Sequence, residues 1–347
     1  MDVYKNVACL KSIPYGNYLL YKKDIYSFLN RISNLKFFNI LHEDFSRPIM
    51  LDCETINTCT NDCIICAYGM MKRDKIIMPL ERFEKVLRDY SDMGGGYLSL
   101  TPRGEIFLDP LLVERLLLLD KYPRIKGVSV TTNAVPINRF SERDLRQILN
   151  SFIKIHISIY GLDDEEYRLM TRRDFYSRVV SNIKMITELI DKEKTLISFG
   201  FRLLKEHSEK DISDWIKKNF GRDDIPYGYT YAYTNWRGAL NDPLPFEGKW
   251  QKRIQGKSHC LMPLVEAAVY SNGDVTYCPC TEFDIIDEFK LGNVDDQSLG
   301  EIFNSDKNKE LWTNLPKTCL SCSNYHPITQ PSQIMSAFQD PINLIGG

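Results

Sequence analysis

Short apolar runs alternate with longer amphipathic stretches between residues 47 and 240. Apolar runs of strand length are typical of buried parallel strands, and apolar residues three and four positions apart are typical of the helices that connect them. This alternation predicts repeated strand–helix units around one parallel sheet. The strands are expected at 48–53, 97–100, 128–132, 153–158, 196–203 and 227–233, and the helices at 80–93, 110–119, 142–151, 175–191 and 209–220.

The number of strand–helix units bounds the fold class. Six units are fewer than the eight of a complete (β/α)8 barrel, which needs about 250 residues. We therefore expect an α/β fold with a partial (β/α)6 TIM-type barrel over 47–240. In such barrels the reactive groups lie on the loops at the carboxyl ends of the strands. Residues 1–46 are expected to form an N-terminal packing extension, and 331–347 a C-terminal tail.

Composition and charge narrow the classes of partner. The 347 residues carry a formal net charge of −2, and the pI is about 6.3. A chain without a strong positive field is not expected to bind nucleic acid or an anionic membrane. No apolar segment reaches the ~18 residues of a membrane-spanning helix, and the N-terminus lacks the pattern of a signal peptide. We therefore expect a cytoplasmic protein.

Three cysteines lie in one short loop after the first expected strand. Cys59, Cys63 and Cys66 have the spacing C-x3-C-x2-C. Thiolates this close together can all bind one iron–sulfur cube, although a zinc knuckle is an alternative for the bare spacing. Three ligands on a four-iron cluster leave one iron open, which indicates chemistry instead of structure. Polar motifs after the next strands favour the cluster, because they would meet at the same end of the barrel.

Five further cysteines lie in the last quarter of the chain. Cys260, Cys278, Cys319 and Cys322 are expected to form a second, closed site with four ligands, two from a hairpin and two from a C-x2-C loop. Zinc and an iron–sulfur cluster are both chemically sound there. The fifth, Cys280, is interpreted as a catalytic group near the substrate, an exchanged ligand or a structural thiol. The long interval without cysteines predicts two separate metal centres.

The first cysteine loop resembles the hallmark of the radical S-adenosylmethionine (radical SAM) superfamily. The resemblance implies a [4Fe-4S] cluster whose open iron binds S-adenosyl-L-methionine. It also implies a 5′-deoxyadenosyl radical that abstracts hydrogen from a substrate. A partial barrel is the fold that this resemblance implies as well.

The C-terminal hairpin at 271–278 and the segments 291–294 and 298–303 resemble the auxiliary-cluster domains called SPASM and, in their short form, twitch. Full SPASM domains carry more cysteines than this chain offers. The resemblance therefore implies a twitch domain over 255–330 with one auxiliary [4Fe-4S] cluster.

The resemblance to the superfamily also implies contacts with S-adenosylmethionine. The run 101–105 is similar to the family's Gly-Gly-Glu segment, with Arg103 at the first glycine. Glu105 would accept a hydrogen bond from the methionine ammonium, and Gly104 would let the backbone approach the ligand. The other matching positions are Ile65 and Tyr68 near the adenine, Thr132, Asn133 and Ser158 at the ribose and carboxylate, and Arg172 at the carboxylate. Each also has an ordinary interpretation, as a buried aliphatic residue, a strand-end cap or a solvated turn.

Two clusters together imply an oxidation. Hydrogen abstraction leaves a carbon radical, and a closed auxiliary cluster can accept the second electron of a two-electron oxidation. The layout resembles the 2-deoxy-scyllo-inosamine dehydrogenases, which implies a sugar- or cyclitol-like small-molecule substrate. Arg237 is expected to contact that substrate or to bridge the domains. The resemblance further implies reduced flavodoxin or ferredoxin as the electron donor.

Other reactions are compatible with the same motifs. SPASM and twitch maturases and epimerases modify a ribosomal precursor peptide or a protein side chain, and sulfatase maturation is one such reaction. Many of them carry an N-terminal leader-binding domain, for which residues 1–46 are too short. A zinc-binding interaction protein is the alternative outside enzymes, and it leaves the motifs at the barrel mouth unexplained.

Overall fold

The computed structural model describes residues 48, 50–100, 103–254, 260, 262–278, 283–313 and 315–325, together with the pairs 14–15 and 18–19. The expected packing extension and the expected C-terminal tail therefore lie outside the described residues, apart from a short hairpin, β1 (Pro14–Tyr15) and β2 (Tyr18–Leu19). Cys280 lies outside them as well.

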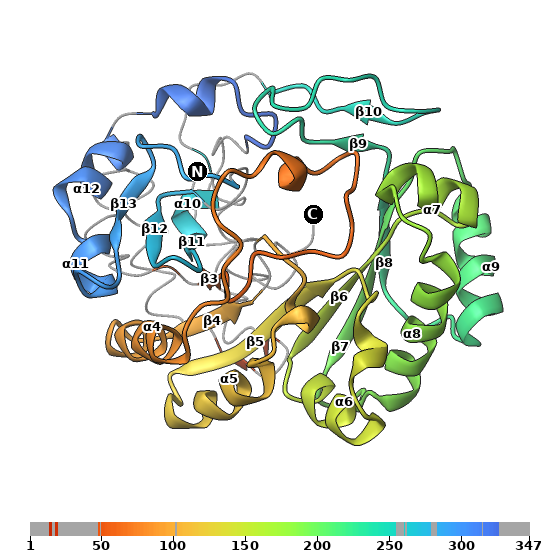
Figure 1. Cartoon of the computed structure of the whole chain (residues 1–347), viewed down its shortest axis with the longest axis horizontal. Helices are drawn as coiled ribbons and strands as arrows, with labels where there is room; N and C mark the ends of the chain where they lie inside the picture. The colour runs from red at the N-terminus through yellow and green to blue at the C-terminus, as the bar shows by residue number, and fades with distance from the viewer. Residues whose placement is uncertain are drawn as a thin grey trace, which may run out of the picture.

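Six parallel strands form the expected partial barrel (Figure 1). They pair side by side in chain order, and their bounds match the expected strands within a few residues. The strands are β3 (Met50–Cys53), β4 (Gly96–Ser99), β5 (Ile125–Thr132), β6 (Lys154–Ile159), β7 (Leu196–Arg202) and β8 (Tyr227–Thr230). The prediction of an α/β fold with a partial (β/α)6 barrel is confirmed.

Helices cover the outer face of this sheet (Figure 1). They are α4 (Leu80–Asp92), α5 (Leu112–Leu118), α6 (Glu142–Leu149), α7 (Asp164–Thr171), α8 (Tyr176–Leu189) and α9 (Glu209–Phe220). Short 3-10 turns stand at η1 (Ala67–Met70), η2 (Ile106–Leu108), η3 (Leu119–Lys121), η4 (Ile137–Arg139) and η5 (Lys317–Leu320). The sequence pattern missed α7, because this short helix has only two buried apolar side chains, Tyr167 and Met170.

Helix α4 shows how the apolar pattern makes the core. Phe83, Val86, Leu87 and Tyr90 recur at helical spacing and are fully buried against the sheet. The phenol of Tyr90 donates to the carbonyl oxygen of Tyr97 at 3.2 Å and so ties the helix to β4. A buried phenol needs such a partner, because an unpaired hydroxyl in the core would be costly.

The strand expected at 227–233 is interrupted in the structure. β8 ends at Thr230, whose Oγ1 accepts a hydrogen bond from the amide of Ala232 at 3.0 Å. The next residues leave the barrel sheet and form β9 (Ala232–Tyr233), which pairs in parallel with β10 (Lys249–Trp250). A hydroxyl that bonds its own backbone two residues away favours a turn over a continuous ladder.

The C-terminal strands continue the barrel sheet instead of forming a separate one. β11 (Glu266–Val269) pairs in parallel with β3, and β12 (Asp274–Thr276) and β13 (Lys290–Asn293) follow in antiparallel order. The sheet therefore has nine strands, from β13 through β3 to β8. The remaining helices of this region are α10 (Met262–Val265), α11 (Leu299–Phe303) and α12 (Asp306–Thr313).

The expected Asn-Gly hairpin joins β11 to β12. Gly273 has a φ of 90°, which only glycine adopts without strain, and the carbonyl oxygen of Tyr270 accepts its amide hydrogen at 2.8 Å. A side chain at this position would also meet Asn293 Oδ1 at 2.7 Å. Among the helices that the structure describes, none is both long enough and apolar enough to cross a membrane.

Candidate active site and two cysteine centres

A cavity of about 860 Å³ occupies the mouth and interior of the partial barrel. Its walls include the loops that follow the barrel strands, as expected from the fold. The thiols of Cys59, Cys63 and Cys66 line it together. Other predicted cofactor contacts that line the same cavity are Ile65, Tyr68, Gly104, Glu105, Thr132, Asn133 and Ser158.

Backbone hydrogen bonds hold the cysteine loop in place. The amides of Asp62 and Ile64 donate to carbonyl oxygens at the end of α7, at 3.1 and 2.9 Å. The amide of Cys59 donates to the phenol oxygen of Tyr68 at 3.0 Å. Tyr68 therefore supports the first cysteine in addition to lining the cavity, a contact that sequence spacing does not reveal.

The three thiols are free and share one electrostatic environment. Burial raises the pKa of Cys59 to about 12 and that of Cys66 to about 11. Burial, and then the two neighbouring thiols, raise the pKa of Cys63 well above its ordinary value. Three buried thiols that repel one another's charge need cationic metal to become thiolates. Their soft donor chemistry thus fits an iron–sulfur cluster.

Glu105 joins three segments beside the cysteine loop. Its carboxylate accepts hydrogen bonds from the hydroxyl of Thr132 and from the amide of Asn133, both at 2.7 Å. Asn133 in turn lies with Nδ2 3.5 Å from the sulfur of Cys59. Burial raises the pKa of Glu105 to about 7, although these hydrogen bonds oppose the rise. The predicted cofactor contacts after β4 and β5 thus form one connected group.

Gly104 is required by the protein's own backbone. A Cβ at this position would lie 2.3 Å from the carbonyl oxygen of Ile56 and 3.0 Å from that of Thr58. The glycine lets the loop after β4 pass directly beside the segment that leads into the cysteines. The close approach at Gly104 in the structure is to the polypeptide, and the predicted approach to a ligand stays a prediction.

Two predicted contacts lie away from this cavity. Arg172 ends α7 with a φ of 54°, and its side chain is 58% exposed and pairs with Asp62 at 3.5 Å. It is absent from the cavity lining. Arg237 lines the second cysteine cavity, with its guanidinium carbon 6.0 Å from the centre of the Phe289 ring.

The sequence analysis missed the polar residues of the barrel interior. Arg202, at the carboxyl end of β7, lines the cavity and interacts electrostatically with Cys63 and Cys66. Other missed residues of the wall are Asp52, Ser99, Lys154, His156, Ser198 and Glu266. Alternating polar positions in the run 154–159 were the signal for part of this set, because inward positions of a strand recur with period two.

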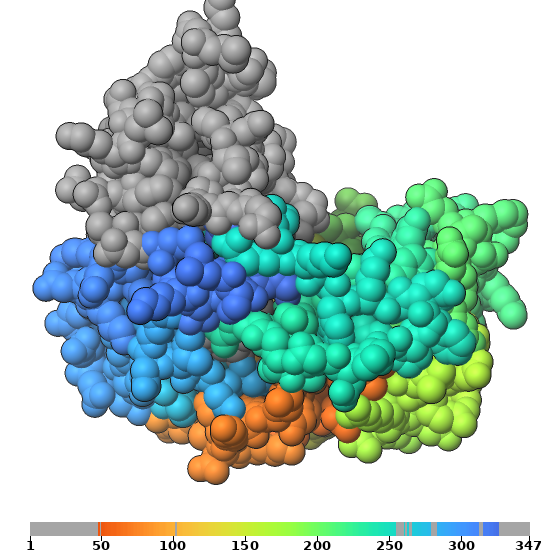
Figure 2. Space-filling model, turned by 90° about the horizontal axis from the view of Figure 1, so that it is seen from above, coloured from red at the N-terminus to blue at the C-terminus, as the bar shows by residue number. Residues whose placement is uncertain are grey.

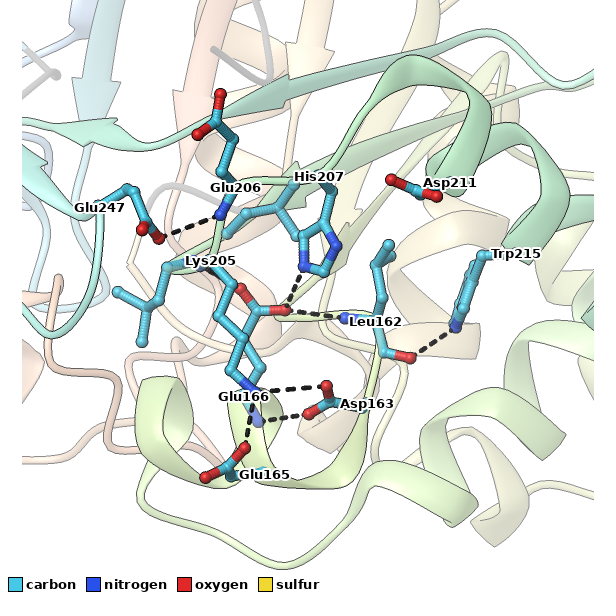
Figure 3. A network of polar contacts seen from close by, with 12 residues as sticks. Leu162, Asp163, Glu165, Glu166, Lys205, Glu206, His207, Asp211, Trp215 and Glu247 are labelled. Carbon is cyan, nitrogen blue, oxygen red and sulfur yellow. Dashed lines mark hydrogen bonds and ion pairs between the residues drawn. The ribbon is translucent and has the colours of Figure 1, made fainter.

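A buried carboxylate positions the segment after Arg202 (Figure 3). Glu166 on α7 is fully buried and accepts hydrogen bonds from the amides of Leu204 and Lys205 at 2.6 and 2.8 Å. Its other oxygen accepts from the amide of Leu162 at 3.0 Å and lies 3.1 Å from Nε2 of His207. The carboxylate therefore ties α7, which also supports the cysteine loop, to the end of β7.

The second cysteine centre is a narrow cavity beside the first. Cys260, Cys278, Cys319 and Cys322 all line it, as predicted. Burial, and then the neighbouring thiols, raise the pKa of Cys319 well above its ordinary value. Apolar residues close the cavity, namely Pro263, Phe289 and Tyr325. A closed set of four soft donors fits an iron–sulfur cluster without an open position.

The two centres are joined by contacts across the sheet and its loops. The buried carboxylate of Glu54, just after β3, pairs with Arg73 at 2.8 Å and accepts hydrogen bonds from the amide and hydroxyl of Ser271. On another face, the hydroxyls of Thr234 and Ser323 lie 2.9 Å apart. Figure 2 shows the β9–β10 region and the C-terminal residues side by side on that face.

Comparison with known families matches both parts of the chain. The radical SAM superfamily matches residues 53–216, and SPASM, an iron–sulfur cluster-binding domain, matches residues 260–323. The first range contains the open cysteine loop and the four barrel strands β4 to β7, and the second contains the four cysteines of the closed site. The predicted resemblance is confirmed.

Curated relatives share only part of their length with this chain. It is 28% identical over 174 residues to a probable GTP 3′,8-cyclase of Methanothermobacter thermautotrophicus, which covers 49% of this chain and 54% of that protein. It is 25% identical over 162 residues to a GTP 3′,8-cyclase of Alkaliphilus oremlandii, covering 46% and 48%. The chain thus spans about half the length of the curated relatives it matches.

Solved structures share the fold at low sequence identity. SuiB of Streptococcus suis, bound to precursor peptide SuiA, has a TM-score of 0.59 at 17% identity and covers 85% of this chain and 73% of its own. BtrN in complex with AdoMet and 2-DOIA has a TM-score of 0.54 at 17% identity, covering 82% and 95%. The enzyme anSMEcpe with bound AdoMet has a TM-score of 0.51 at 18% identity, covering 86% and 95%.

Proposed function

Since the chain is a radical SAM protein with a C-terminal SPASM domain, we propose that it carries out a two-electron oxidation of a small hydroxylated molecule. When bound, the first cluster and S-adenosylmethionine supply the 5′-deoxyadenosyl radical chemistry of the superfamily. Cys59, Cys63 and Cys66 would hold this cluster, and Cys260, Cys278, Cys319 and Cys322 would hold the auxiliary one.

The shared wall between the two cavities carries the proposal. Asn324 lines both the barrel cavity and the closed cysteine cavity. Trp236 lines the barrel cavity, and its neighbour in the chain, Arg237, lines the closed cysteine cavity. A cluster held by four thiolates has no open position for a substrate. A single residue, Asn324, lines both cavities, so a cluster at the closed site would lie close enough to accept the second electron.

The polar interior supports a hydroxylated small molecule as the substrate. Hydroxyl-bearing residues line the cavity on three of the barrel strands, Ser99 on β4, Thr131 on β5 and Ser198 on β7. Charged side chains add further hydrogen-bonding groups to the same walls. Buried polar groups need partners, and a sugar- or cyclitol-like molecule provides many of them at once. BtrN, a solved structure with this fold, was crystallised with 2-DOIA.

One observation favours a second candidate, the modification of a peptide. Strand β8 is the last strand of the sheet, and within the described residues no strand pairs with its other edge. Tyr227 and Tyr229 on this strand are 37% and 40% exposed and line the cavity. An open strand edge beside a reaction chamber is a site where an extended peptide can add a strand.

The electron donor and the location follow from the same chemistry. Reductive cleavage of S-adenosylmethionine needs a low-potential electron, for which we propose reduced flavodoxin or ferredoxin. Cys53, Cys59, Cys63, Cys66 and Cys319 are free thiols, which is consistent with a reducing cytoplasm.

Deuterium transfer tests the proposed reaction. The anaerobically reconstituted protein is reduced with dithionite in the presence of S-adenosylmethionine and a panel of ring-deuterated cyclitols and amino sugars. We expect deuterium in 5′-deoxyadenosine and a product that lacks two hydrogens relative to its substrate. A parallel panel of peptides tests the second candidate by the same transfer. Deuterium transfer from a peptide, with none from the cyclic alcohols, would overturn the small-molecule proposal.

A further inference from the structure

Glu266 is a buried carboxyl to which no described residue donates a hydrogen bond. It begins β11, faces the barrel cavity and is only 5% exposed. Within the described residues it makes no hydrogen bond and no ion pair, and its interactions are electrostatic ones with Asp52, Cys278 and Arg103. Burying a carboxyl without a hydrogen-bond partner costs free energy. Because Glu266 lies in a cavity wall, a ligand group that enters the cavity could supply the missing partner.

Asp52 is the second carboxyl of this wall. It stands on β3, the strand that pairs with β11, and it lines the same cavity with a hydrogen bond to Ser99. The two carboxyls interact electrostatically, and burial raises the pKa of Asp52 to about 6. Burial, and then the charge of Asp52, raise the pKa of Glu266 well above its usual range.

Arg103 compensates only part of this negative wall. Its guanidinium interacts with both carboxyls, but it also donates to the phenol oxygen of Tyr270 at 2.9 Å and lies over two aromatic rings. One cation does not offset the burial of both carboxyls, and the pKa of Glu266 stays raised beside it.

The part of the cavity wall formed by β6 and β7 carries positively charged side chains. Lys154 and His156 on β6 and Arg202 on β7 line it. Burial, and then the charges of Arg202 and Lys154, lower the pKa of His156 to about 3, so this imidazole is neutral. The barrel interior is therefore polarised, with carboxyls on β3 and β11 and cations on β6 and β7.

We propose that Asp52 and Glu266 bind a primary ammonium group of the substrate, a recognition role that rests on the proposed oxidation. An ammonium offers three hydrogen-bond donors to a carboxyl that has none among the described residues, and its positive charge favours the ionised form of both carboxyls. A bound metal ion is a poorer match, because no third ligand joins the pair among the described residues. The substrate class is thus narrowed to amine-bearing polyols.

Binding without turnover tests this site. The protein is reconstituted with both clusters and S-adenosylmethionine and is left without reductant. Isothermal titration calorimetry then compares scyllo-inosamine with scyllo-inositol, which has a hydroxyl in place of the amine. We expect the wild type to prefer the amine by at least about tenfold, as for one lost charge-assisted contact. In Glu266→Gln, and to a smaller extent in Asp52→Asn, this preference is expected to fall toward one.

A matched control separates charge recognition from general damage. Ser198→Ala removes a neutral group from the opposite wall, so it is expected to weaken both ligands equally and to keep their ratio. An unchanged ratio in folded Glu266→Gln and Asp52→Asn, or equal affinity of the two ligands in the wild type, overturns the ammonium site. Because no turnover is involved, a failed oxidation assay leaves this result intact.

A third ligand distinguishes the source of the ammonium. Nα-acetyl-lysine methylamide and its norleucine counterpart differ by the side-chain amine. A preference for the lysine compound that depends on Glu266, with no binding of scyllo-inosamine, supports the ammonium site and assigns it to a peptide. The same experiment then counts against the small-molecule oxidation and in favour of the second candidate function.

Discussion

The two cysteine centres of this protein differ in how many thiols they offer and in what surrounds them. The first offers three, on a loop at the wall of a cavity of about 860 Å³ that is rich in polar side chains. The second offers four, in a narrow cavity closed by apolar residues. An open metal position beside polar groups suits chemistry on a ligand, and a closed one suits electron transfer. On the proposed function, the number of thiols and the polarity of their surroundings would together give the two clusters different roles.

Both centres nevertheless belong to one sheet. β11 lies between Cys260 and Cys278 in the chain, and it pairs along the whole of β3, which precedes the first cysteine loop. The fully buried Glu54 then fastens the end of β3 to Ser271 in the auxiliary hairpin. This shared framework fixes the distance between the two centres, which an electron acceptor requires.

The largest effect is expected from the open centre. Cys66→Ala removes one of only three protein ligands, so the cluster loses its support and 5′-deoxyadenosine formation should fall to background. Chromatographic assay of 5′-deoxyadenosine after reduction with dithionite measures this. Substantial cleavage in the variant would contradict the assignment of the open centre. Cys53→Ala is the matched control, because this buried thiol lies in β3 outside both centres.

Loss of a ligand at the closed centre is expected to separate cleavage from product. In Cys319→Ala the open centre is intact, so S-adenosylmethionine should still be cleaved at a reduced rate. The product should be missing, because the second electron has no acceptor. Parallel quantification of 5′-deoxyadenosine and oxidised product gives the ratio. Full product yield would contradict the electron-acceptor role.

Two arginines near the open centre provide a sharper, smaller test. Arg202 lines the cavity, so Arg202→Ala should weaken S-adenosylmethionine binding about tenfold, as for a lost charge-assisted contact. Arg172 is exposed and pairs with Asp62, so Arg172→Ala should change the affinity by no more than about twofold. Equilibrium dialysis with labelled cofactor measures both. The reverse order would restore Arg172 as the cofactor contact that the sequence indicated.

The smallest effect on chemistry is expected at Glu166 (Figure 3). Glu166→Gln replaces one acceptor oxygen by a donor, so at least one backbone amide loses its partner. The free energy of unfolding should fall by about 1–3 kcal/mol. Urea denaturation measures the change, and cofactor affinity should fall only slightly. Glu165→Gln, beside it on the exposed face and paired with Lys205, is the control and should change little. Equal stability of the two variants would contradict the positioning role.

Much of the fold was predictable from the sequence because its signals are periodic. Each of the six barrel strands and five of the six barrel helices follow apolar spacing that the core requires. The grouping of seven cysteines at two cavities was predictable because Cys59, Cys63 and Cys66, and likewise Cys319 and Cys322, are close together in the chain. Short α7 was missed because two buried side chains, Tyr167 and Met170, make too weak a pattern.

The site was less predictable where distant segments meet. Arg202 and Glu266 lie in strands whose apolar character dominates the pattern, and only the folding of the sheet into a partial barrel brings both to one cavity. Arg172 carries the expected charge, but a left-handed backbone at the end of α7 places it outside the cavity lining. The pairing of β11 with β3 has no sequence signal at all, since it joins segments more than 200 residues apart.

Iron, labile sulfide and zinc per chain, measured after anaerobic reconstitution, test the central claim most directly. The account requires two cubes, so we expect about eight irons and about eight sulfides per chain with no bound zinc. Cys319→Ala should then lose about half of the iron and leave the open centre loaded. About four irons with one zinc would make the closed centre structural, and the oxidation would lose its electron acceptor.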